Sequence, residues 1–451
     1  MNDLTAALAR FASAPPFATV PSDAGAIVRT GFIDACATLI AGVPEPVVKI
    51  VGQYLGSRIG TRGEASVLFG TQRASAADAA LINGTAAHAL DYDDVALGGH
   101  PSTVLVPALL AEGEVLGASG AQVVQAYLVG YEVWAELIGR DADAHHIKGW
   151  HPTAVFGTVA AAAAVACLRR LNFEQARNAI GLAGSLAGGL VANFGTMTKP
   201  FHAGRAACAG IEAARLASLG MTAAADAMEH HAGFLSALSP QGRVERERPA
   251  HRLGLDLRIR ETGLNIKKYP VCYAMHRVID GVLDLVKSER LDATQVASVQ
   301  ASVGKTQAAM LRNHAPANAL EAKFSLEFAV ASSLVGQAVG RAQLTDEFVT
   351  RPEVQEAMKK VSTSTVDTVC PLEPFFALTD RVSIRLKNGR EVDTGDIRFA
   401  RGNAKLPLSE SELRVKFMDC ASERTDAQSL YERLAGLERV DNVRALAASH
   451  R

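Results

Sequence analysis

The chain has 451 residues, 48% of them hydrophobic, and its 46 basic and 47 acidic side chains leave a formal net charge of -1. This length predicts two or three domains with enough apolar sequence to bury a core. The balanced charge, with no block of lysine or arginine, argues against a nucleic acid or a membrane surface as a partner.

The N-terminus, the apolar runs and the cysteines bear on location and cofactors. The chain starts Met-Asn-Asp-Leu-Thr, which lacks the basic start and apolar core of a signal peptide, so we expect a cytoplasmic protein. The most apolar run, residues 153–168, is short for a membrane span and predicts a buried helix. The six cysteines include no CxxC pair, which argues against a disulfide framework, a structural zinc or an iron-sulfur cluster. We expect no metal and no organic cofactor.

Residues 1–263 predict an all-helical domain, because they are rich in alanine and leucine and because apolar residues recur at helical spacing. Ser22 or Asp23 is a candidate cap for a helix through residue 40, and Ser119 for one through residue 138. The many alanines and glycines on these helices permit close approach of the helix axes.

Within this domain the segment NGTAAHALDYDDVALGGHPS, residues 83–102, collects acidic and imidazole side chains. They are His88, Asp91, Asp93, Asp94 and His100. Crowded carboxylates raise one another's proton affinity and imidazole titrates near neutrality, so the segment has the groups for acid-base catalysis. The alternative interpretation is a helix C-terminus that runs into a polar loop.

His151 lies between Trp150 and Pro152, at the start of the alanine-rich run. Partial burial beside the tryptophan would lower the pKa of His151 and keep the ring neutral, as a base requires. A structural histidine at a helix start is the alternative. Adjacent histidines on a helix cannot face one ligand, so two such pairs are predicted to lie on the surface. These are His145-His146 and His230-His231.

Lys199 follows a glycine-rich stretch and precedes Pro200, and a helix of small residues begins near His202. A proline near a helix start is favourable, and the free backbone N–H groups there attract an anion. Lys199 and Arg205 add full positive charges, so a substrate carboxylate is the natural partner. A solvated lysine beside a helix end is the alternative.

From residue 264 the pattern changes, and strands are predicted between helices. Alternating or β-branched residues mark the strands, and Asn388-Gly389 predicts a hairpin turn. The predicted strands cover residues 296–303, 361–366 and 382–386, and the predicted helices 280–287 and 324–340. We expect an α+β domain with an antiparallel sheet over residues 264–399, followed by helices that Ser409 and Thr425 cap.

Two lysines open this second domain. Lys267 and Lys268 precede Tyr269, which the next proline biases toward an extended conformation. His276 follows Cys272 by four positions and could share its helical face. Two adjacent lysines, taken alone, indicate a solvated edge.

Five segments of this sequence recur together, in this order, in one known family. They are residues 83–102, 149–157 (GWHPTAVFG), 195–204 (GTMTKPFHAG), 267–276 (KKYPVCYAMH) and 321–328 (EAKFSLEF). The chain thereby resembles the MmgE/PrpD family, which includes 2-methylcitrate dehydratase, cis-aconitate decarboxylase and iminodisuccinate epimerase. The resemblance implies a mainly α fold with a large all-helical domain, completed by residues 400–451, a smaller α+β domain, and a homodimer.

The resemblance also implies an enzyme that removes a proton next to a carboxylate of a small substrate without a cofactor. Such a site needs cations where negative charge develops and a base within reach. Lys199 and Lys267 suit the first role, and His100 and His151 the second. Asp91 would orient a histidine. The implied catalytic residues are Asp91, His100, His151 and Cys272. The implied substrate-binding residues are Asp93, Lys199, His202, Lys267, Tyr269 and His276.

Some residues of this chain differ from those typical of known branches of the family, and these differences indicate which reactions are disfavoured. The decarboxylase branch typically has threonine, histidine and tyrosine where this chain has Val95, Cys272 and Phe328, which disfavours that reaction. The opening motif also differs from that of the dedicated 2-methylcitrate dehydratases. We therefore expect epimerisation of an iminodisuccinate-like substrate, in which one group removes a proton and another returns it. A thiol of lowered pKa at residue 272 would suit one of these roles. A dehydratase is the alternative.

Two interpretations come from other classes of protein. The DxDD pattern also marks all-helical terpene cyclases, whose sites need aromatic walls; aromatic residues are only 6% here. A non-catalytic helical binding protein would show the same small-residue helices and acidic loop, but it would not need Lys199, Lys267 and His151 to converge.

Overall fold

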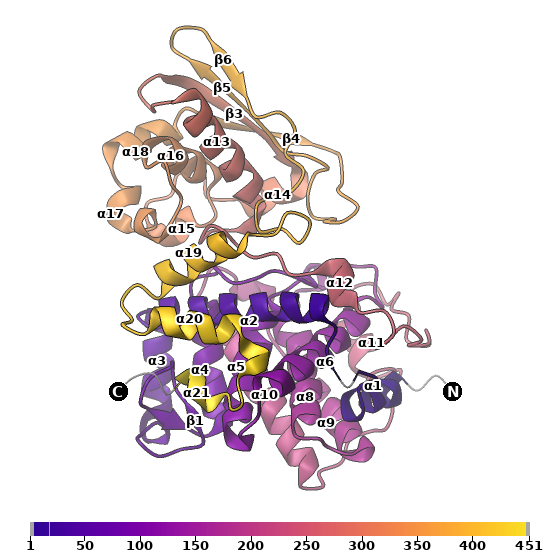
Figure 1. Cartoon of the computed structure of the whole chain (residues 1–451). Helices are drawn as coiled ribbons and strands as arrows, with labels where there is room; N and C mark the ends of the chain where they lie inside the picture. The colour runs from indigo at the N-terminus through magenta and orange to yellow at the C-terminus, as the bar shows by residue number, and fades with distance from the viewer. Residues whose placement is uncertain (1–3, 18, 448–451) are drawn as a thin grey trace. The chain divides into compact units, whose positions relative to one another are not determined.

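The structure is a computed structural model that describes residues 4–17 and 19–447 (Figure 1). It contains two compact units. The helical unit comprises Met1–Ile266 and Ser409–Arg451, and the sheet unit comprises Lys267–Leu408. The change in sequence pattern predicted the corresponding boundaries after residues 263 and 399.

The helical unit contains most of the helices and one short β-ladder. Its first helices are α1 (Leu4–Ser13), α2 (Ser22–Gly42), α3 (Pro46–Leu55), α4 (Ala76–His88), α5 (Pro101–Leu116), α6 (Gly120–Ile138), α7 (His145–Lys148) and α8 (Pro152–Leu168). The others are α9 (Phe173–Leu186), α10 (Thr198–Ser218), α11 (Phe234–Leu238), α12 (Arg258–Thr262), α19 (Glu410–Cys420), α20 (Ala427–Ala435) and α21 (Arg444–Ala447). Strand β1 (Ala65–Ser66) pairs antiparallel with β2 (Arg73–Ala74). Short 3-10 turns are η1 (Gly56–Arg58), η2 (Val191–Asn193) and η5 (Leu437–Arg439).

The core of this unit is built on helix α8, which packs against α5, α6, α9 and α10. All of its residues are buried, as expected for a helix that is apolar on every side. The predicted buried helix over residues 153–168 is therefore confirmed. Unlike α8, helix α2 is long and apolar enough to cross a membrane by length and composition. However, 72% of its most apolar 18-residue stretch is buried inside the structure.

Small residues bring the core helices close together, as the sequence predicted. A Cβ atom built on Gly204 of α10 would lie 2.0 Å from the carbonyl oxygen of Leu81 on α4. A Cβ on Gly84 of α4 would lie 2.8 Å from the Cα atom of Gly204. Any larger side chain at these positions would force α4 and α10 apart. These two helices carry site residues at their ends, so their spacing fixes the site.

Helix caps are confirmed at two of the four predicted places. The Ser119 and Ser409 side chains accept from backbone N–H groups in capping boxes at the starts of α6 and α19. Helix α2 instead follows Pro21, and α20 follows Asp426, and neither N-cap residue makes a side-chain cap hydrogen bond. The caps predicted at Ser22 or Asp23 and at Thr425 are therefore wrong.

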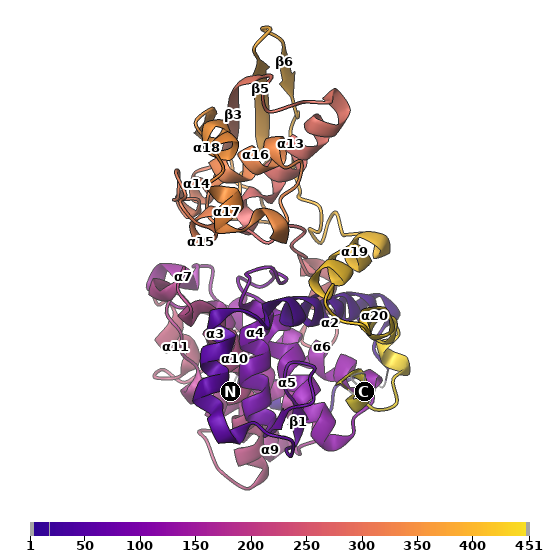
Figure 2. The same cartoon turned by 90° about the vertical axis from the view of Figure 1, so that its left-hand side faces the viewer.

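The sheet unit holds a mixed four-stranded sheet in the order β4-β3-β5-β6. Its strands are β3 (Val296–Gly304), β4 (Val361–Val366), β5 (Arg381–Leu386) and β6 (Glu391–Asp393). Its helices are α13 (His276–Glu289), α14 (Lys305–Met310), α15 (Ala319–Ala322), α16 (Leu326–Val335), α17 (Asp346–Val349) and α18 (Pro352–Met358), with 3-10 turns η3 (Tyr273–Met275) and η4 (Arg341–Gln343). Helices α13 and α16 cover one face of the sheet (Figures 1 and 2).

The predicted strands exist, but the sheet is not purely antiparallel. Strand β3 pairs antiparallel with β5 and parallel with β4. The chain reaches β4 through helices α14 to α18, and a long helical connection of this kind lets the second strand run parallel to the first. The hairpin between β5 and β6 forms at the predicted dipeptide, where Gly389 has φ of 86° and the Asn388 side chain accepts from the Arg390 N–H at 3.0 Å.

Candidate active site

Four helix ends of the helical unit supply the polar side chains of one cluster. His88 is the last residue of α4, and Lys199 lies in the first turn of α10. His100 and His151 are the N-cap residues of α5 and α8, and a proline follows each. A residue before proline is driven out of the helical conformation, and proline itself suits the first helical position. The two His-Pro dipeptides therefore place an imidazole where each helix begins.

Asp93 joins two of these histidines. Its Oδ1 lies 2.8 Å from Nδ1 of His88, and its Oδ2 lies 2.6 Å from Nδ1 of His100. The side chain of Asp93 is fully buried. Burial alone would raise the pKa of the Asp93 carboxyl, but the two imidazoles hold that pKa well below its usual range. Asp93 is thus a buried carboxylate that orients two rings.

The structure corrects the predicted role of Asp93. Asp93 is predicted to bind substrate and Asp91 to orient a histidine, but both oxygens of Asp93 face histidine nitrogens and its side chain is buried. Asp91 lies at a turn with φ of 53°, a left-handed conformation that is uncommon for a residue with a side chain. This turn directs the side chains of Asp91 and Asp93 to different partners.

Asp91 pairs with the lysine of α10. Lys199 Nζ donates to Asp91 Oδ1 at 2.7 Å, and Nε2 of His100 lies 3.9 Å from the same oxygen. Lys199 also lies over the ring of Phe194, with 5.3 Å from Nζ to the centroid. The structure therefore brings Asp91, His100 and Lys199 together as a contiguous acid, base and cation.

His151 is the third imidazole of the cluster. Burial, assisted by the nearby Lys199, lowers the pKa of His151 well below its usual value, so the ring is neutral at pH 7. Its Nδ1 lies 3.1 Å from Nδ1 of His202, and its ring packs edge-on against Phe194. Burial and then Lys199 also lower the pKa of His202. Both predicted histidines therefore lie in the cluster as neutral rings.

Two side chains of the cluster were not selected as site residues from the sequence. His88 is fully buried, and burial lowers its pKa to about 4. Its position at the end of α4, in the same segment as Asp93, was the available signal. Phe194 contacts both Lys199 and His151, but nothing in its local sequence distinguishes it from a core phenylalanine.

A buried network holds the loop that carries the aspartates. Asp94 accepts from the Ser102 hydroxyl at 3.0 Å, and Ser102 in turn lies 2.7 Å from the Tyr127 hydroxyl. Burial, and then the nearby Asp34, raise the pKa of the Asp94 carboxyl well above its usual value. Asp94 is therefore a structural side chain of this loop.

The C-terminal segment contributes a cation to the same loop. Lys416 of α19 donates to Asp34 Oδ1 at 2.5 Å and to the carbonyl oxygen of Tyr92 at 2.8 Å. Its Nζ also lies 3.9 Å from the centroid of the Tyr92 ring. We call Lys416, Asp34 and Tyr92 the Lys416 network. It ties α2, α19 and the aspartate loop together in the buried interior.

Replacing Lys416 by methionine is expected to destabilise the helical unit by about 3 kcal/mol, because it leaves the buried Asp34 carboxylate without its cation. Both tryptophans, Trp134 and Trp150, belong to this unit, so urea unfolding followed by tryptophan fluorescence measures the loss. The exposed Lys49 of α3 supplies the control: Lys49→Met should change the unfolding free energy by less than about 0.5 kcal/mol. Equal midpoints for the two variants would contradict the expected role.

The remaining predicted site residues belong to the sheet unit. Lys267 is 2% exposed. The Tyr269 hydroxyl donates to Asp280 at 2.7 Å, and the ring of His276 packs against that of Tyr269. These contacts fit packing within this unit, and the contact of Tyr269 and His276 with substrate stays a prediction.

Cys272 precedes the helix that His276 begins. Its side chain is partly exposed, and its N–H donates to the carbonyl oxygen of Lys323 at 2.9 Å. The 3-10 turn η3 separates Cys272 from α13, which starts at His276. The predicted shared helical face of the two residues is therefore wrong.

Two further expectations change with the structure. His145 was predicted to lie on the surface, but it is 4% exposed and its ring packs edge-on against Phe156. Phe328 was counted as a departure at the site, but it is fully buried and packs against Phe348 in an apolar cluster of the sheet unit. The phenylalanine at 328 is thus explained by packing.

Two family models match this chain, and the second extends beyond the sheet unit into the C-terminal helices of the helical unit. The MmgE/PrpD N-terminal domain matches residues 6–247, and the MmgE/PrpD C-terminal domain matches residues 269–437. Cis-aconitate decarboxylase of Mus musculus is 30% identical over 91% of this chain and 85% of its own length. The Homo sapiens protein of that name is 29% identical over 92% and 87%. The Aspergillus terreus protein is 24% identical over 99% and 95%.

Proposed function

The chain belongs to the MmgE/PrpD family, and we propose that this enzyme moves a proton at the carbon next to a carboxylate of a small di- or tricarboxylic acid. The observation that carries the proposal is the contact of Lys199 and His100 with one oxygen of Asp91, at 2.7 and 3.9 Å. A cation for a carboxylate and a base for a proton thus lie side by side, as this chemistry requires.

His100 is the proposed base. Its Nδ1 faces Asp93 Oδ2 and, at 2.9 Å, the carbonyl oxygen of Asp94. Both of these atoms can only accept, so the proton of the neutral ring stays on Nδ1 and the lone pair is on Nε2. Asp93 then stabilises the imidazolium that forms, as the buried carboxylate of a catalytic triad does.

Lys199 is the proposed anchor of the substrate carboxylate. An ammonium has three protons, and its bond to Asp91 uses one of them. As His100 takes the proton from carbon, the electron pair moves onto the carboxylate, and Lys199 stabilises the added charge. The neutral His151 is the proposed hydrogen-bond donor to that carboxylate, with its tautomer set by His202.

A lyase reaction fits the relatives best, because those compared are cis-aconitate decarboxylases. In water elimination, the electron pair left by the proton expels hydroxide from the neighbouring carbon. In decarboxylation, CO₂ leaves first and protonated His100 gives its proton to carbon. The same residues serve both reactions: His100 removes a proton from carbon in water elimination and delivers one to carbon in decarboxylation.

Epimerisation is the second candidate, and the sequence departures at Val95 and Cys272 favour it over decarboxylation. This reaction needs a second acid besides the base, and the partly exposed Cys272 thiol is the group proposed for it from the sequence. A homodimer and a cytoplasmic location are further predictions from the sequence.

Proton NMR in D₂O with purified enzyme tests the proposal against iminodisuccinate, 2-methylcitrate, citrate, cis-aconitate and malate. New olefinic signals from a hydroxy acid would identify a dehydratase, and loss of one carboxyl from cis-aconitate a decarboxylase. Deuterium uptake with an unchanged skeleton would identify an epimerase. If all five compounds stay unchanged, and alanine at Lys199, Lys267 and His151 leaves any binding intact, the helical binding protein is favoured instead.

A further inference from the structure

His88 has a buried ring nitrogen that points into the histidine cluster. Its side chain is 0% exposed, and its Nδ1 faces Asp93 at 2.8 Å. A carboxylate can only accept, so the proton of the neutral ring is on Nδ1 and Nε2 presents a lone pair. Among the residues that the structure describes, Nε2 of His88 has no hydrogen-bond partner. A buried lone pair without a partner is unfavourable, and this calls for a ligand.

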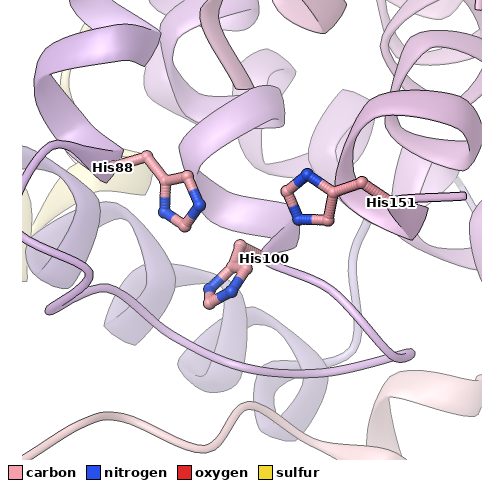
Figure 3. A group of neighbouring side chains, drawn as sticks. All are labelled: His88, His100 and His151. Atoms are coloured by element: carbon pink, nitrogen blue, oxygen red, sulfur yellow. The ribbon is translucent and has the colours of Figure 1, made fainter. Parts of the chain in front are cut away.

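The neighbouring histidines face the same space (Figure 3). The rings of His88 and His100 lie 4.3 Å apart between centroids, and that of His151 lies 6.2 and 6.4 Å from them. Contacts with Asp93 or His202 involve Nδ1 of every ring, which leaves the Nε2 atoms as candidate ligands. His151 would bind a metal in the tautomer that carries its proton on Nδ1 and would donate to a carboxylate in the other. One nitrogen from each ring lies within 4.8 Å of the other two.

We propose that His88, His100 and His151 bind a divalent transition-metal ion, such as Zn²⁺ or Co²⁺, through Nε2, and that the ion inhibits the enzyme. Three histidines with a fourth position left for water form a known type of zinc site. Zn–N distances of about 2.0–2.1 Å require the three nitrogens to converge on one point, and the proposal includes the rotation of the rings that this requires.

The surroundings of the three rings favour a cation. Asp93 lies behind two of the ligands, and a carboxylate in that position orients a metal-binding imidazole and raises its basicity. Asp91 adds a second negative charge within the cluster, and Lys199, at 2.7 Å from Asp91, offsets only one of the two. The balance of fixed charge at the rings is therefore negative.

Inhibition follows because the ion occupies the lone pair that His100 needs as a base. This consequence rests on the proposed function, whereas metal binding rests on the geometry alone. The two are measured separately: binding by the absorption spectrum of Co²⁺, which needs no substrate, and inhibition by deuterium exchange or product formation.

The experiment titrates Co²⁺ into the full-length protein, prepared without a histidine tag. We expect one Co²⁺ per chain with the intense visible bands of four-coordinate cobalt, and displacement of these bands by Zn²⁺. His88→Gln and His151→Gln should each weaken Co²⁺ binding by at least about 100-fold. This exceeds the roughly 10–100-fold loss of affinity that follows removal of a residue that only hydrogen-bonds to a metal ligand. His231→Gln, at an exposed histidine of the same unit, should bind as the wild type does.

Tryptophan fluorescence and far-UV circular dichroism verify that each variant is folded, and the two ligand variants provide independent tests. Weak bands of six-coordinate cobalt, or equal binding by wild type and both ligand variants, would overturn the site. One equivalent of Zn²⁺ should abolish turnover and EDTA should restore it. Full turnover with the metal bound would overturn the inhibition. An enzyme inactive on every compound would contradict the proposed function, and the cobalt spectrum would still decide the site.

Discussion

Replacing Asp93 by asparagine is expected to lower kcat by about 10³-fold, with a small change in KM. One carboxylate oxygen accepts from Nδ1 of His88, and the other lies 2.6 Å from Nδ1 of His100, so the negative charge favours a proton on Nδ1 of both neutral rings. An asparagine amide must donate with its nitrogen, so one ring has to present a lone pair at Nδ1 and carry its proton on Nε2. If that ring is His100, the base is lost, and a wrong tautomer of this kind costs a triad enzyme about 10⁴-fold.

The measurement is steady-state kinetics on the best substrate from the NMR panel, with tryptophan fluorescence to establish that the variant is folded. Asp226→Asn, at an exposed aspartate of the same unit, is the matched control and should retain full activity. A loss of less than tenfold in kcat, or a loss expressed only in KM, would show that Asp93 does not act by orienting the base.

Lys199→Met is expected to lower kcat/KM by about 10²–10³-fold, the usual cost of removing one group that stabilises developing negative charge. Both KM and kcat should worsen, because the ammonium binds the carboxylate in the ground state and meets more charge in the transition state. Methionine keeps most of the apolar part of the lysine side chain and removes the ammonium, which also contacts the Phe194 ring. The loss therefore reports the charge.

Lys199→Arg tests the role of the positive charge by keeping a cation at this position. It should recover part of the activity, since it restores a cation beside Asp91, although its planar fork places the charge differently. Lys49→Met is the exposed control. If KM of Lys199→Met equals that of the wild type, Lys199 does not anchor the substrate, and the proposed orientation of substrate in the site fails.

The fold was predictable where a local pattern determines the structure. Ser119 and Ser409 are followed three positions later by Gln122 and Glu412, and this spacing satisfies helix N-termini without help from the rest of the chain. Asn388-Gly389 makes its turn for a similar reason. The direction of β4 was not predictable, because strand pairing depends on the route taken by the intervening helices.

The sequence predicted which residues form the candidate site better than it predicted the role of each residue. The aspartates at 91 and 93 have nearly equivalent sequence surroundings, and the left-handed turn at Asp91 decides which of them meets Lys199 and which meets the histidines. Lys416 lies 324 positions from the Tyr92 carbonyl that it contacts. The sequence around Lys416 gives no indication that this lysine is buried against Tyr92.

The Lys416 network has a consequence for the order of events during synthesis. The first stretch of the helical unit ends at Ile266, and the chain then builds the whole sheet unit before α19 emerges. At about 5–20 residues per second, the interval between residues 266 and 416 lasts roughly 8–30 s. Throughout that time Asp34 lacks its cation and the aspartate loop lacks its anchor. A nascent chain can therefore form most of the helices of this unit early, yet its aspartate loop is anchored only after α19 has been synthesised.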